Sequence, residues 1–243
     1  MPAARMNAVR LPTQRLAARA RRPLWISCEG INGVGKTTVT RALAARIGER
    51  CLLLDELTDQ GKETLPGRVI AALAAQGDVF LRTGHPAVET LALLALKVRE
   101  TERLAGRADV PEVVLEDRGL DSVAVYQAAI LGAHQPENDP RDVARHVLAT
   151  MTPWRHSPDA TVLLSGDHRQ CTQRFAQRIG RTLTARDVQI IECVDALYAD
   201  LAAAEPGRYR VIDTTGRPVE EVVAEAALVI EDVARQKETD HAA

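Results

Sequence analysis

The sequence has few aromatic residues, and its four cysteines form no recognisable pair. Aromatic side chains make up only 3% of the chain, so Ala, Leu and Val must fill most of its core. The cysteines show neither a CxxC spacing nor a nearby histidine at metal-binding distance; they are Cys28, Cys51, Cys171 and Cys193. This pattern argues against a disulfide scaffold or a zinc site and predicts buried free thiols in a reducing cytoplasm.

A strong net charge and long apolar runs are also missing. The 31 basic and 33 acidic residues leave a net charge of −2, so no overall basic field favours nucleic-acid binding. No apolar run has the length needed to span a membrane. Residues 1–23 are rich in arginine but lack the apolar segment of a secretory signal, and we interpret them as a disordered extension. A transit peptide or a basic arm is the alternative interpretation. We therefore expect a cytoplasmic protein with no nucleic-acid or membrane partner.

Apolar runs of strand length alternate with stretches of helical periodicity. The predicted strands cover residues 24–28, 51–54, 112–116, 159–164 and 209–212. The predicted helices cover residues 37–47, 62–75, 86–104, 120–131, 142–151, 169–177, 187–204 and 218–234. This alternation predicts an α/β fold with a mainly parallel, five-stranded sheet flanked by helices. We expect a single domain over residues 24–235, followed by a polar tail over residues 236–243.

A glycine-rich motif joins the first predicted strand to the first predicted helix. It reads G-x-x-x-x-G-K-T over residues 30–37, the pattern of a P-loop, whose backbone N–H groups and helix dipole bind phosphate. Lys36 is expected to bridge the β- and γ-phosphates of ATP, and Thr37 to hold Mg²⁺. The predicted nucleotide-binding residues are Gly30, Asn32, Gly33, Val34, Gly35, Lys36, Thr37 and Thr38. The motif alone does not separate kinases from GTPases or motor ATPases.

An Asp-Arg pair ends the third predicted strand. Ligands of parallel sheets bind outside the carboxyl ends of the strands, so Asp117 and Arg118 are expected to face the P-loop. Asp117 is a candidate Mg²⁺ ligand through water, and Arg118 a candidate clamp for the phosphate of an acceptor. A surface ion pair is the alternative. Ser122 and Tyr126 follow four residues apart on one helical face, where Tyr126 is either a site residue or a core aromatic.

Five arginines surround Gly180, namely Arg169, Arg174, Arg178, Arg181 and Arg186. On a loop that closes over ATP, such charges would neutralise the transferring phosphate. A solvated basic face is the alternative. We expect a short Arg-rich lid over about residues 174–187, with Arg178 and Arg181 as its catalytic charges.

Taken together, these segments resemble the thymidylate kinase family. The resemblance rests on the opening motif at 28–38, the Asp117-Arg118 segment with its following Ser122 and Tyr126-Gln127, the strand at 158–164, the lid, and the segments at 195–198 and 211–213. They follow the family's order from about residue 24 to 235. The resemblance implies a three-layer P-loop kinase fold and a phosphotransferase that uses ATP and Mg²⁺. Its implied acceptor is a nucleoside monophosphate, either dTMP or a related pyrimidine deoxynucleotide. Its catalytic residues would be Lys36, Asp117, Arg118, Arg178 and Arg181.

The acceptor side departs from the family pattern. Leu93 and Lys97 stand where the family has a base-stacking Phe and an Arg, and neither offers a π face or a planar fork. Asn32 replaces an Asp, Gly119 replaces a Tyr, and residues 55–59 replace an Arg-Glu-Pro segment. The expected acceptor-binding residues are Asn32, Leu93, Lys97, Arg118, Ser122, Tyr126 and Gln127.

Two alternative functions stay open at the level of the sequence. One is a kinase of a modified nucleotide or another small metabolite in specialised metabolism. The other is a nucleotide-dependent switch with little turnover. Arg118 and the lid favour a kinase, since a switch needs no clamp for a second substrate. The family also implies a homodimer through the helix over residues 90–104, for which a buried core helix is the alternative.

Overall fold

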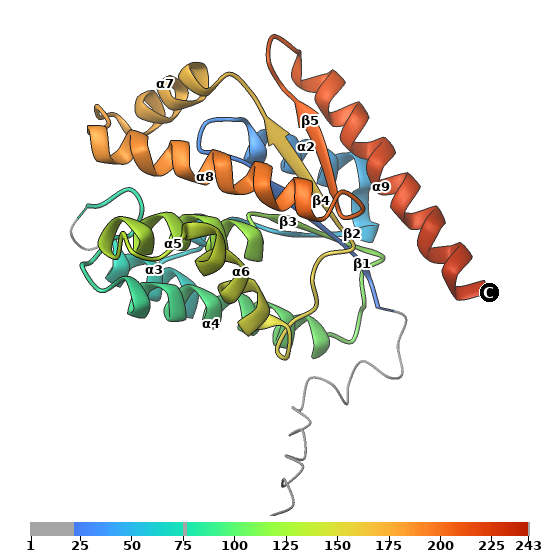
Figure 1. Ribbon diagram of the computed structural model, residues 1–243. Helices are drawn as coiled ribbons and strands as arrows, with labels where there is room; N and C mark the ends of the chain where they lie inside the picture. The colour runs from blue at the N-terminus through green and yellow to red at the C-terminus, as the bar shows by residue number, and fades with distance from the viewer. Residues whose placement is uncertain (1–21, 75–76, 243) are drawn as a thin grey trace, which may run out of the picture.

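A five-stranded, entirely parallel sheet forms the centre of the computed structural model, which describes residues 22–74 and 77–242 (Figure 1). The strand order is β2-β3-β1-β4-β5, so β1 lies in the middle. The strands are β1 Leu24–Glu29, β2 Cys51–Leu54, β3 Val113–Asp117, β4 Ala160–Ser165 and β5 Tyr209–Asp213. All five match their predicted positions to within about one residue. The interpretation of residues 1–23 as an extension lies outside the described residues, apart from Arg22 and Pro23.

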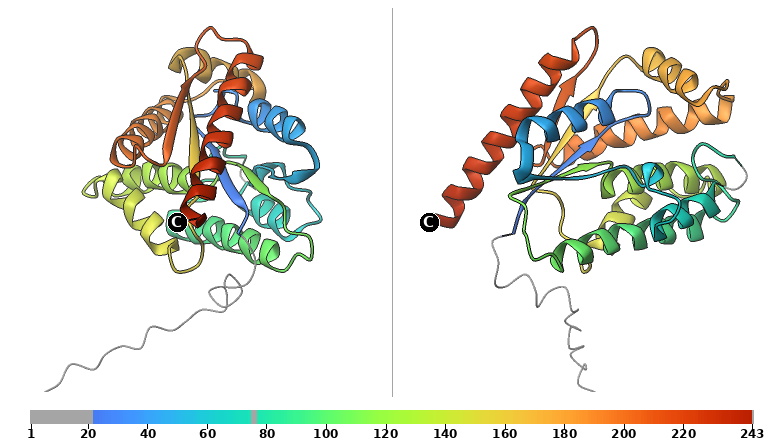
Figure 2. Two further views of the ribbon diagram at one scale, coloured as in Figure 1. Left: turned by 90° about the vertical axis from the view of Figure 1, so that its right-hand side faces the viewer. Right: turned by 180° about the vertical axis from the view of Figure 1, so that it is seen from behind.

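Helices cover both faces of the sheet, which gives the expected three layers (Figures 1 and 2). One face is covered by α2 Lys36–Ile47 and α9 Val219–Ala242, which pack against each other. On the other face α5 Leu120–His134 packs against α4 Pro86–Ala105, α6 Pro140–Met151 and α8 Ala185–Ala204, with α3 Leu65–Leu73 beside α4. Short 3-10 turns occur at Gly48–Arg50 and Leu57–Asp59. Because helices bury the sheet from both sides, its central strands are continuous apolar runs rather than alternating ones.

The remaining helix, α7 His168–Ile179, belongs to the predicted lid segment. It ends at Gly180, whose φ of 66° is a left-handed conformation that glycine adopts without strain. Thr184 and Asp187 then form a reciprocal capping box that starts α8. The predicted helix–loop–helix arrangement of the lid is therefore present.

The last helix is longer than expected. The sequence pattern predicted an end near residue 234 and a polar tail, whereas α9 continues to Ala242. Gln236, Lys237 and Glu238 are good helix formers, so polarity alone gave no reason for the helix to stop. Lys237 Nζ also contacts Asp159 Oδ2 at 2.9 Å, which ties the extra turns to the start of β4.

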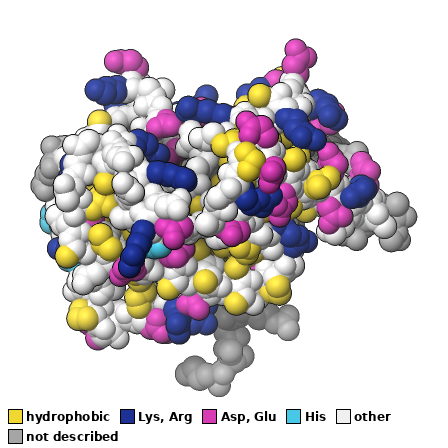
Figure 3. All heavy atoms as spheres, turned by 90° about the horizontal axis from the view of Figure 1, so that it is seen from above, with side chains coloured by type: hydrophobic (Ala, Val, Ile, Leu, Met, Phe, Trp, Pro, Cys, Tyr) yellow, Lys and Arg dark blue, Asp and Glu magenta, His cyan; other side chains and the backbone are white. Residues whose placement is uncertain are grey.

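The parallel sheet gathers the predicted site residues at one edge. Cys28 in β1 lies opposite Asp117 in β3, and the P-loop leaves β1 directly after Glu29. Seen from above, the molecule carries acidic and basic side chains interspersed on that face (Figure 3). The four cysteines are free, as predicted, but only Cys28 and Cys171 are buried, whereas Cys51 and Cys193 are partly exposed. Over residues 22–74 and 77–242, no helix is long and apolar enough to cross a bilayer.

Candidate active site

The P-loop is a backbone cradle that needs glycine at two close approaches. Gly30 has φ of 139°, and a Cβ added to it would lie 2.4 Å from the Leu164 carbonyl oxygen. Gly33 has φ of 83°, and its added Cβ would lie 2.0 Å from the Cys171 carbonyl oxygen. Only residues without a side chain fit these positions. The first turn of α7 thus rests directly on the loop.

Lys36 is folded back over the loop that it follows. Its side chain is buried, and Nζ donates hydrogen bonds to the carbonyl oxygens of Gly30, at 2.8 Å, and Ile31, at 2.7 Å. Burial, together with the charge of Arg118, lowers the pKa of Lys36 to about 7. An anionic phosphate in the cradle would add negative charge beside this ammonium and favour its charged form.

Asp117 and Thr37 form an oxygen-rich corner beside the P-loop. Asp117 is buried, and its Oδ1 accepts no hydrogen bond from any residue that the structure describes. Burial raises the pKa of Asp117, and a hydrogen bond with the Thr37 side chain opposes the shift. The described residues contain no cluster of three or more His, Cys, Asp or Glu side chains suited to a metal. A carboxylate and a hydroxyl nevertheless fit Mg²⁺, which keeps several waters and takes further oxygens from phosphates.

A cavity beside the P-loop, here called the P-loop cavity, has a volume of about 420 Å³. Two lid arginines, Arg174 and Arg178, line it opposite the loop. Arg181 does not, since it donates to the Gly77 carbonyl oxygen at 3.1 Å and lies 3.4 Å from Asp187. The other lining residues come from the P-loop, Glu56, Arg118, the turn after β5, and the helices α2, α7 and α9: Gly33, Val34, Gly35, Lys36, Thr37, Thr38, Val39, Gln170, Thr214, Gly216, Arg217, Val219 and Val222.

Arg118 lies where this cavity meets a second one. Its backbone is left-handed, with φ of 64°. Its guanidinium Nη2 donates to Asn32 Oδ1, its Nε lies 2.9 Å from Glu56 Oε1, and its Cζ stands 5.2 Å from the centre of the Tyr126 ring. Burial opposes ionisation of Glu56, yet Arg118 and Lys36 hold the pKa of that carboxyl below its usual value. The hydrogen bond between Arg118 and Asn32 therefore links the segment after β3 directly to the P-loop.

The second cavity, the α4–α5 cavity, has a volume of about 110 Å³. All of the expected acceptor-binding residues line it: Asn32, Leu93, Lys97, Arg118, Ser122, Tyr126 and Gln127. Phe80 also lines it, with its ring centre 6.0 Å from that of Tyr126. Sequence reasoning missed Phe80, which lies in the loop between α3 and α4. The cavity therefore contains two aromatic faces although Leu93 provides none.

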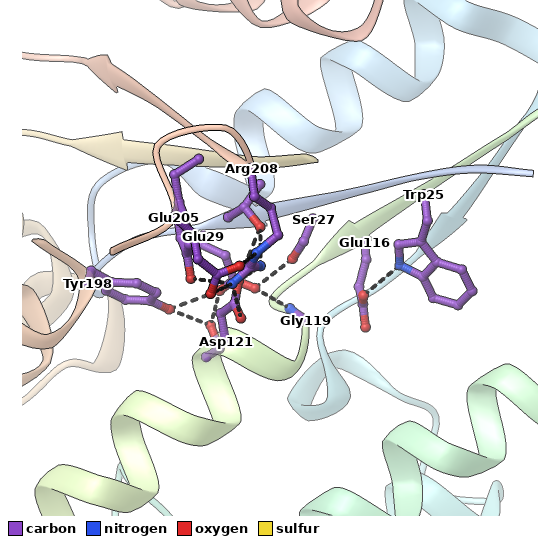
Figure 4. A network of polar contacts seen from close by, with 12 residues as sticks. Trp25, Ser27, Glu29, Glu116, Gly119, Asp121, Tyr198, Glu205 and Arg208 are labelled. Carbon is purple, nitrogen blue, oxygen red and sulfur yellow. Dashed lines mark hydrogen bonds and ion pairs between the residues drawn. The ribbon is translucent and has the colours of Figure 1, made fainter. Parts of the chain in front are cut away.

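Several polar groups of the α4–α5 cavity are already paired. Lys97 Nζ lies 3.0 Å from Glu116 Oε1 and 3.1 Å from Glu100 Oε2. Arg155 also pairs with Glu116 and stacks on Trp25, whose Nε1 donates to Glu116 Oε2 at 2.9 Å (Figure 4). Burial disfavours the ionised form of Glu116, but the charges of Arg155 and Lys97 hold the pKa of its carboxyl at about 2. The ammonium of Lys97 is thus neutralised by carboxylates beneath the cavity.

Two other expected residues are also held by neighbours. Gln127 Oε1 accepts a hydrogen bond from Thr90 Oγ1 at 3.0 Å. The Ser122 hydroxyl faces Glu29 and lies 2.8 Å from the Tyr198 hydroxyl. No sequence pattern predicted these pairings, because each joins residues on different elements.

Comparison with known proteins decides the family. The model of the family described as thymidylate kinase matches residues 28–226. The chain belongs to the thymidylate kinase family. This assignment confirms the resemblance drawn from the P-loop, the Asp117-Arg118 segment and the lid.

Curated thymidylate kinases are similar over most of both chains. The thymidylate kinase of Clavibacter michiganensis is 32% identical over 214 residues, which cover 83% of this chain and 91% of the relative. That of Bifidobacterium longum is 30% identical over 197 residues, covering 79% and 90%.

Solved thymidylate kinase structures share the fold. The crystal structure from Ehrlichia chaffeensis aligns with a TM-score of 0.59 at 20% identity, covering 87% of this chain and 99% of that one. The structure from Candida albicans aligns with a TM-score of 0.61 at 17% identity, covering 87% and 92%. The expected P-loop kinase fold is thereby confirmed. The family match and the curated relatives confirm the assignment as a thymidylate-kinase-like phosphotransferase, and favour neither a kinase of specialised metabolism nor a switch.

Proposed function

We propose that this thymidylate kinase family member transfers the γ-phosphoryl group of ATP to dTMP, giving ADP and dTDP. The observation that carries the proposal is the position of Arg118, which lines both the P-loop cavity and the α4–α5 cavity. A phosphoryl group that passes from one nucleotide to the other must cross this junction. Relatives named thymidylate kinase, similar over most of their length, support dTMP as the acceptor.

On the P-loop side, the backbone cradle and Lys36 would bind the phosphates of ATP. Lys36 would exchange its bonds to the Gly30 and Ile31 carbonyl oxygens for the more strongly charged phosphate oxygens. Arg174 and Arg178 line the same cavity and would offset charge on the transferring group. We assign Arg181 no contact with the phosphates, because its guanidinium lies at Gly77 and Asp187.

Mg²⁺ would be held by Thr37 and, through water, by Asp117. The buried, unpaired Oδ1 of Asp117 supports this assignment. When bound, the ion offsets the negative charge of the phosphates between which the group is transferred.

On the acceptor side, Arg118 would exchange Glu56 for the phosphate of dTMP. Both ligands are anionic and fit the same guanidinium fork. The rings of Phe80 and Tyr126 would pack against the nucleoside, with Leu93 adding apolar contact. The four free cysteines favour a reducing, cytoplasmic setting. A homodimer would use the outer side of α4, where Val88 and Leu91 are exposed.

The test is an acceptor panel. Purified protein, Mg²⁺ and ATP are mixed with dTMP, dUMP, dCMP, dAMP, thymidine and unrelated alcohols, and ADP release is measured. We expect dTMP to give the highest kcat/KM. A preference for thymidine or for a non-nucleotide alcohol would contradict the proposal, as would the absence of stimulation by any acceptor despite tight ATP binding. The Arg41→Ala variant is the control protein and should keep the wild-type acceptor preference. Arg41 is an exposed arginine that contacts Asp59 outside both cavities.

A further inference from the structure

Glu29, the last residue of β1, has a carboxylate with no exposed surface and no cation among its hydrogen-bond partners. Its Oε1 accepts from Ser27 Oγ at 2.6 Å and from the Gly119 backbone N–H at 2.7 Å. Its Oε2 accepts from the Tyr198 hydroxyl at 2.9 Å and from the Ser122 hydroxyl (Figure 4). Four neutral groups from β1, α5 and the turn and helix around them thus converge on one buried carboxylate.

One of these bonds acts on the backbone next to Arg118. The left-handed conformation of Arg118 is disfavoured for a residue with a side chain, and surrounding contacts must maintain it. Its own N–H donates to the Cys28 carbonyl oxygen at 3.2 Å, and the next N–H, that of Gly119, donates to Glu29. The end of β1 therefore fixes the peptide on each side of the Arg118 Cα, and so the direction of its side chain.

Gly119 fits the same interpretation. A Cβ added at this position would lie 2.5 Å from Ser27 Oγ and 3.0 Å from Glu29 Oε1. A side chain here would displace the carboxylate or its serine partner. The unexpected glycine after the Asp-Arg pair is thus what lets Glu29 reach the backbone.

Tyr198 links this arrangement to α8. It is buried, and its hydroxyl lies 2.8 Å from Ser122 Oγ as well as bonding Glu29. It lines neither the P-loop cavity nor the α4–α5 cavity. Any effect of its hydroxyl on acceptor binding must therefore be relayed through other residues.

We propose that Glu29 and Tyr198 are positioning residues for the acceptor clamp: they hold the backbone at Arg118 so that its guanidinium faces the junction of the two cavities. The inference rests on the proposed role of Arg118 in binding the phosphate of dTMP. Neither residue lines the P-loop cavity or the α4–α5 cavity, and neither forms part of the phosphate cradle.

The decisive variant is Tyr198→Phe, which removes one hydroxyl and keeps the ring. Loss of a hydrogen bond to a buried carboxylate is expected to raise the KM for dTMP roughly tenfold, with the KM for ATP within about twofold. The matched control is Thr161→Val, which removes a buried hydroxyl that donates to Asp121 at 3.1 Å in the neighbouring network. Equal increases in the KM for dTMP in the two variants, or equal increases in both KM values for Tyr198→Phe, would overturn the inference.

A double-mutant cycle shows whether Tyr198 acts on the KM for dTMP through Arg118 or through a general disturbance of the fold. In an Arg118→Lys background, Tyr198→Phe is expected to change the KM for dTMP by less than about twofold, because no planar fork remains to be oriented. A persisting tenfold effect would overturn the inference. If Arg118→Lys itself leaves the KM for dTMP unchanged, the proposed role of Arg118 fails. If Arg118→Lys raises it and Tyr198→Phe does not, only the positioning role fails.

Glu29→Leu provides a second variant. It removes both carboxylate oxygens, so the Gly119 N–H and the Tyr198 hydroxyl both lose their acceptor. Its effect on the KM for dTMP is expected to exceed that of Tyr198→Phe. A smaller effect in a folded Glu29→Leu protein would contradict the role of Glu29. If this variant does not fold, the Tyr198→Phe cycle still decides.

Discussion

The two cavities differ in the groups that form their walls, which are mainly backbone in one and side chains in the other. The P-loop cavity is formed largely by backbone turning around glycines, with arginines from α7 opposite. The α4–α5 cavity is smaller and is formed by side chains, several of which already pair with one another, as Lys97 does with Glu116 and Gln127 with Thr90. Arg118 is shared by both and is paired with Glu56.

The difference separates general from specific recognition. A backbone cradle binds phosphate whatever the rest of the ligand is, since every residue supplies the same N–H group. A pocket of paired side chains selects by shape and by the bonds it must break. Removal of the P-loop lysine should therefore abolish chemistry, whereas substitutions around the α4–α5 cavity should change stability and acceptor choice.

The largest effect is expected from Lys36→Ala. Removal of the ammonium that would bind the phosphates of ATP should lower kcat by about 10³-fold, while dTMP affinity measured by calorimetry stays within about twofold. Retention of more than one tenth of the wild-type kcat would contradict the P-loop assignment. A parallel loss of dTMP affinity would contradict the separation of the two cavities.

The second effect is on stability, and it follows from the ion pairs under the α4–α5 cavity. Glu116→Gln leaves the buried cations of Lys97 and Arg155 with only the Glu100 carboxylate between them, which should lower the free energy of unfolding by about 3 kcal/mol. Urea unfolding measures it. The control Arg50→Ala breaks an exposed ion pair with Glu112 and should cost less than about 1 kcal/mol.

The difference in stability between wild type and Glu116→Gln should also depend on pH. The pKa of Glu116 is about 2 in the folded protein, below the ordinary value of 4.5. Its stabilising contribution is therefore complete above about pH 4.5 and is lost as the pH falls toward 2. The stability difference between wild type and Glu116→Gln should shrink over that window. A difference independent of pH would show that the charge of Glu116 is not what matters.

The third effect contrasts the cations of the two cavities. With a pKa of about 7 in the unliganded protein, Lys36 loses its proton above neutrality, so kcat/KM for ATP should fall about tenfold per pH unit above that point. The pKa of Arg118 is raised by Glu56 despite burial, so kcat/KM for dTMP at saturating ATP should stay flat from pH 7 to 9. Initial rates over this range provide the measurement, and identical slopes for the two substrates would contradict the contrast.

The smallest effect concerns the lid. Arg178→Ala should raise the KM for ATP about fivefold, because Arg178 lines the P-loop cavity, whereas Arg181→Ala should change it less than about twofold. Each variant is the control for the other. An Arg181→Ala effect as large as that of Arg178→Ala would mean that Arg181 leaves Asp187 and Gly77 to reach the phosphates.

The sequence predicted which residues line the two cavities better than it predicted how their side chains pair, for a physical reason. Glycine spacing, a strand before it and a helix after it are local features, and they define the cradle around Lys36. The pairings of Lys97 and Gln127, and the place of Phe80 in the cavity, depend on contacts between separate elements. The same holds for Arg178 and Arg181, which are three residues apart yet face different neighbours. The length of α9 was missed because a polar segment can be a good helix.

The contact between α9 and the start of β1 bears on how the chain could be circularly permuted. Lys237 Nζ lies 3.2 Å from the Pro23 carbonyl oxygen, so the two ends of the described fold are neighbours in space. A short linker from Thr239 to Arg22 would close residues 22–239 into a ring. Reopening that ring in the exposed loop over residues 107–110 would leave each strand its present neighbours and make β3 the first strand to be synthesised. In such a permuted chain, the ribosome would synthesise the Arg118 segment before the P-loop, and the two segments would still contact each other in the same way in the folded protein.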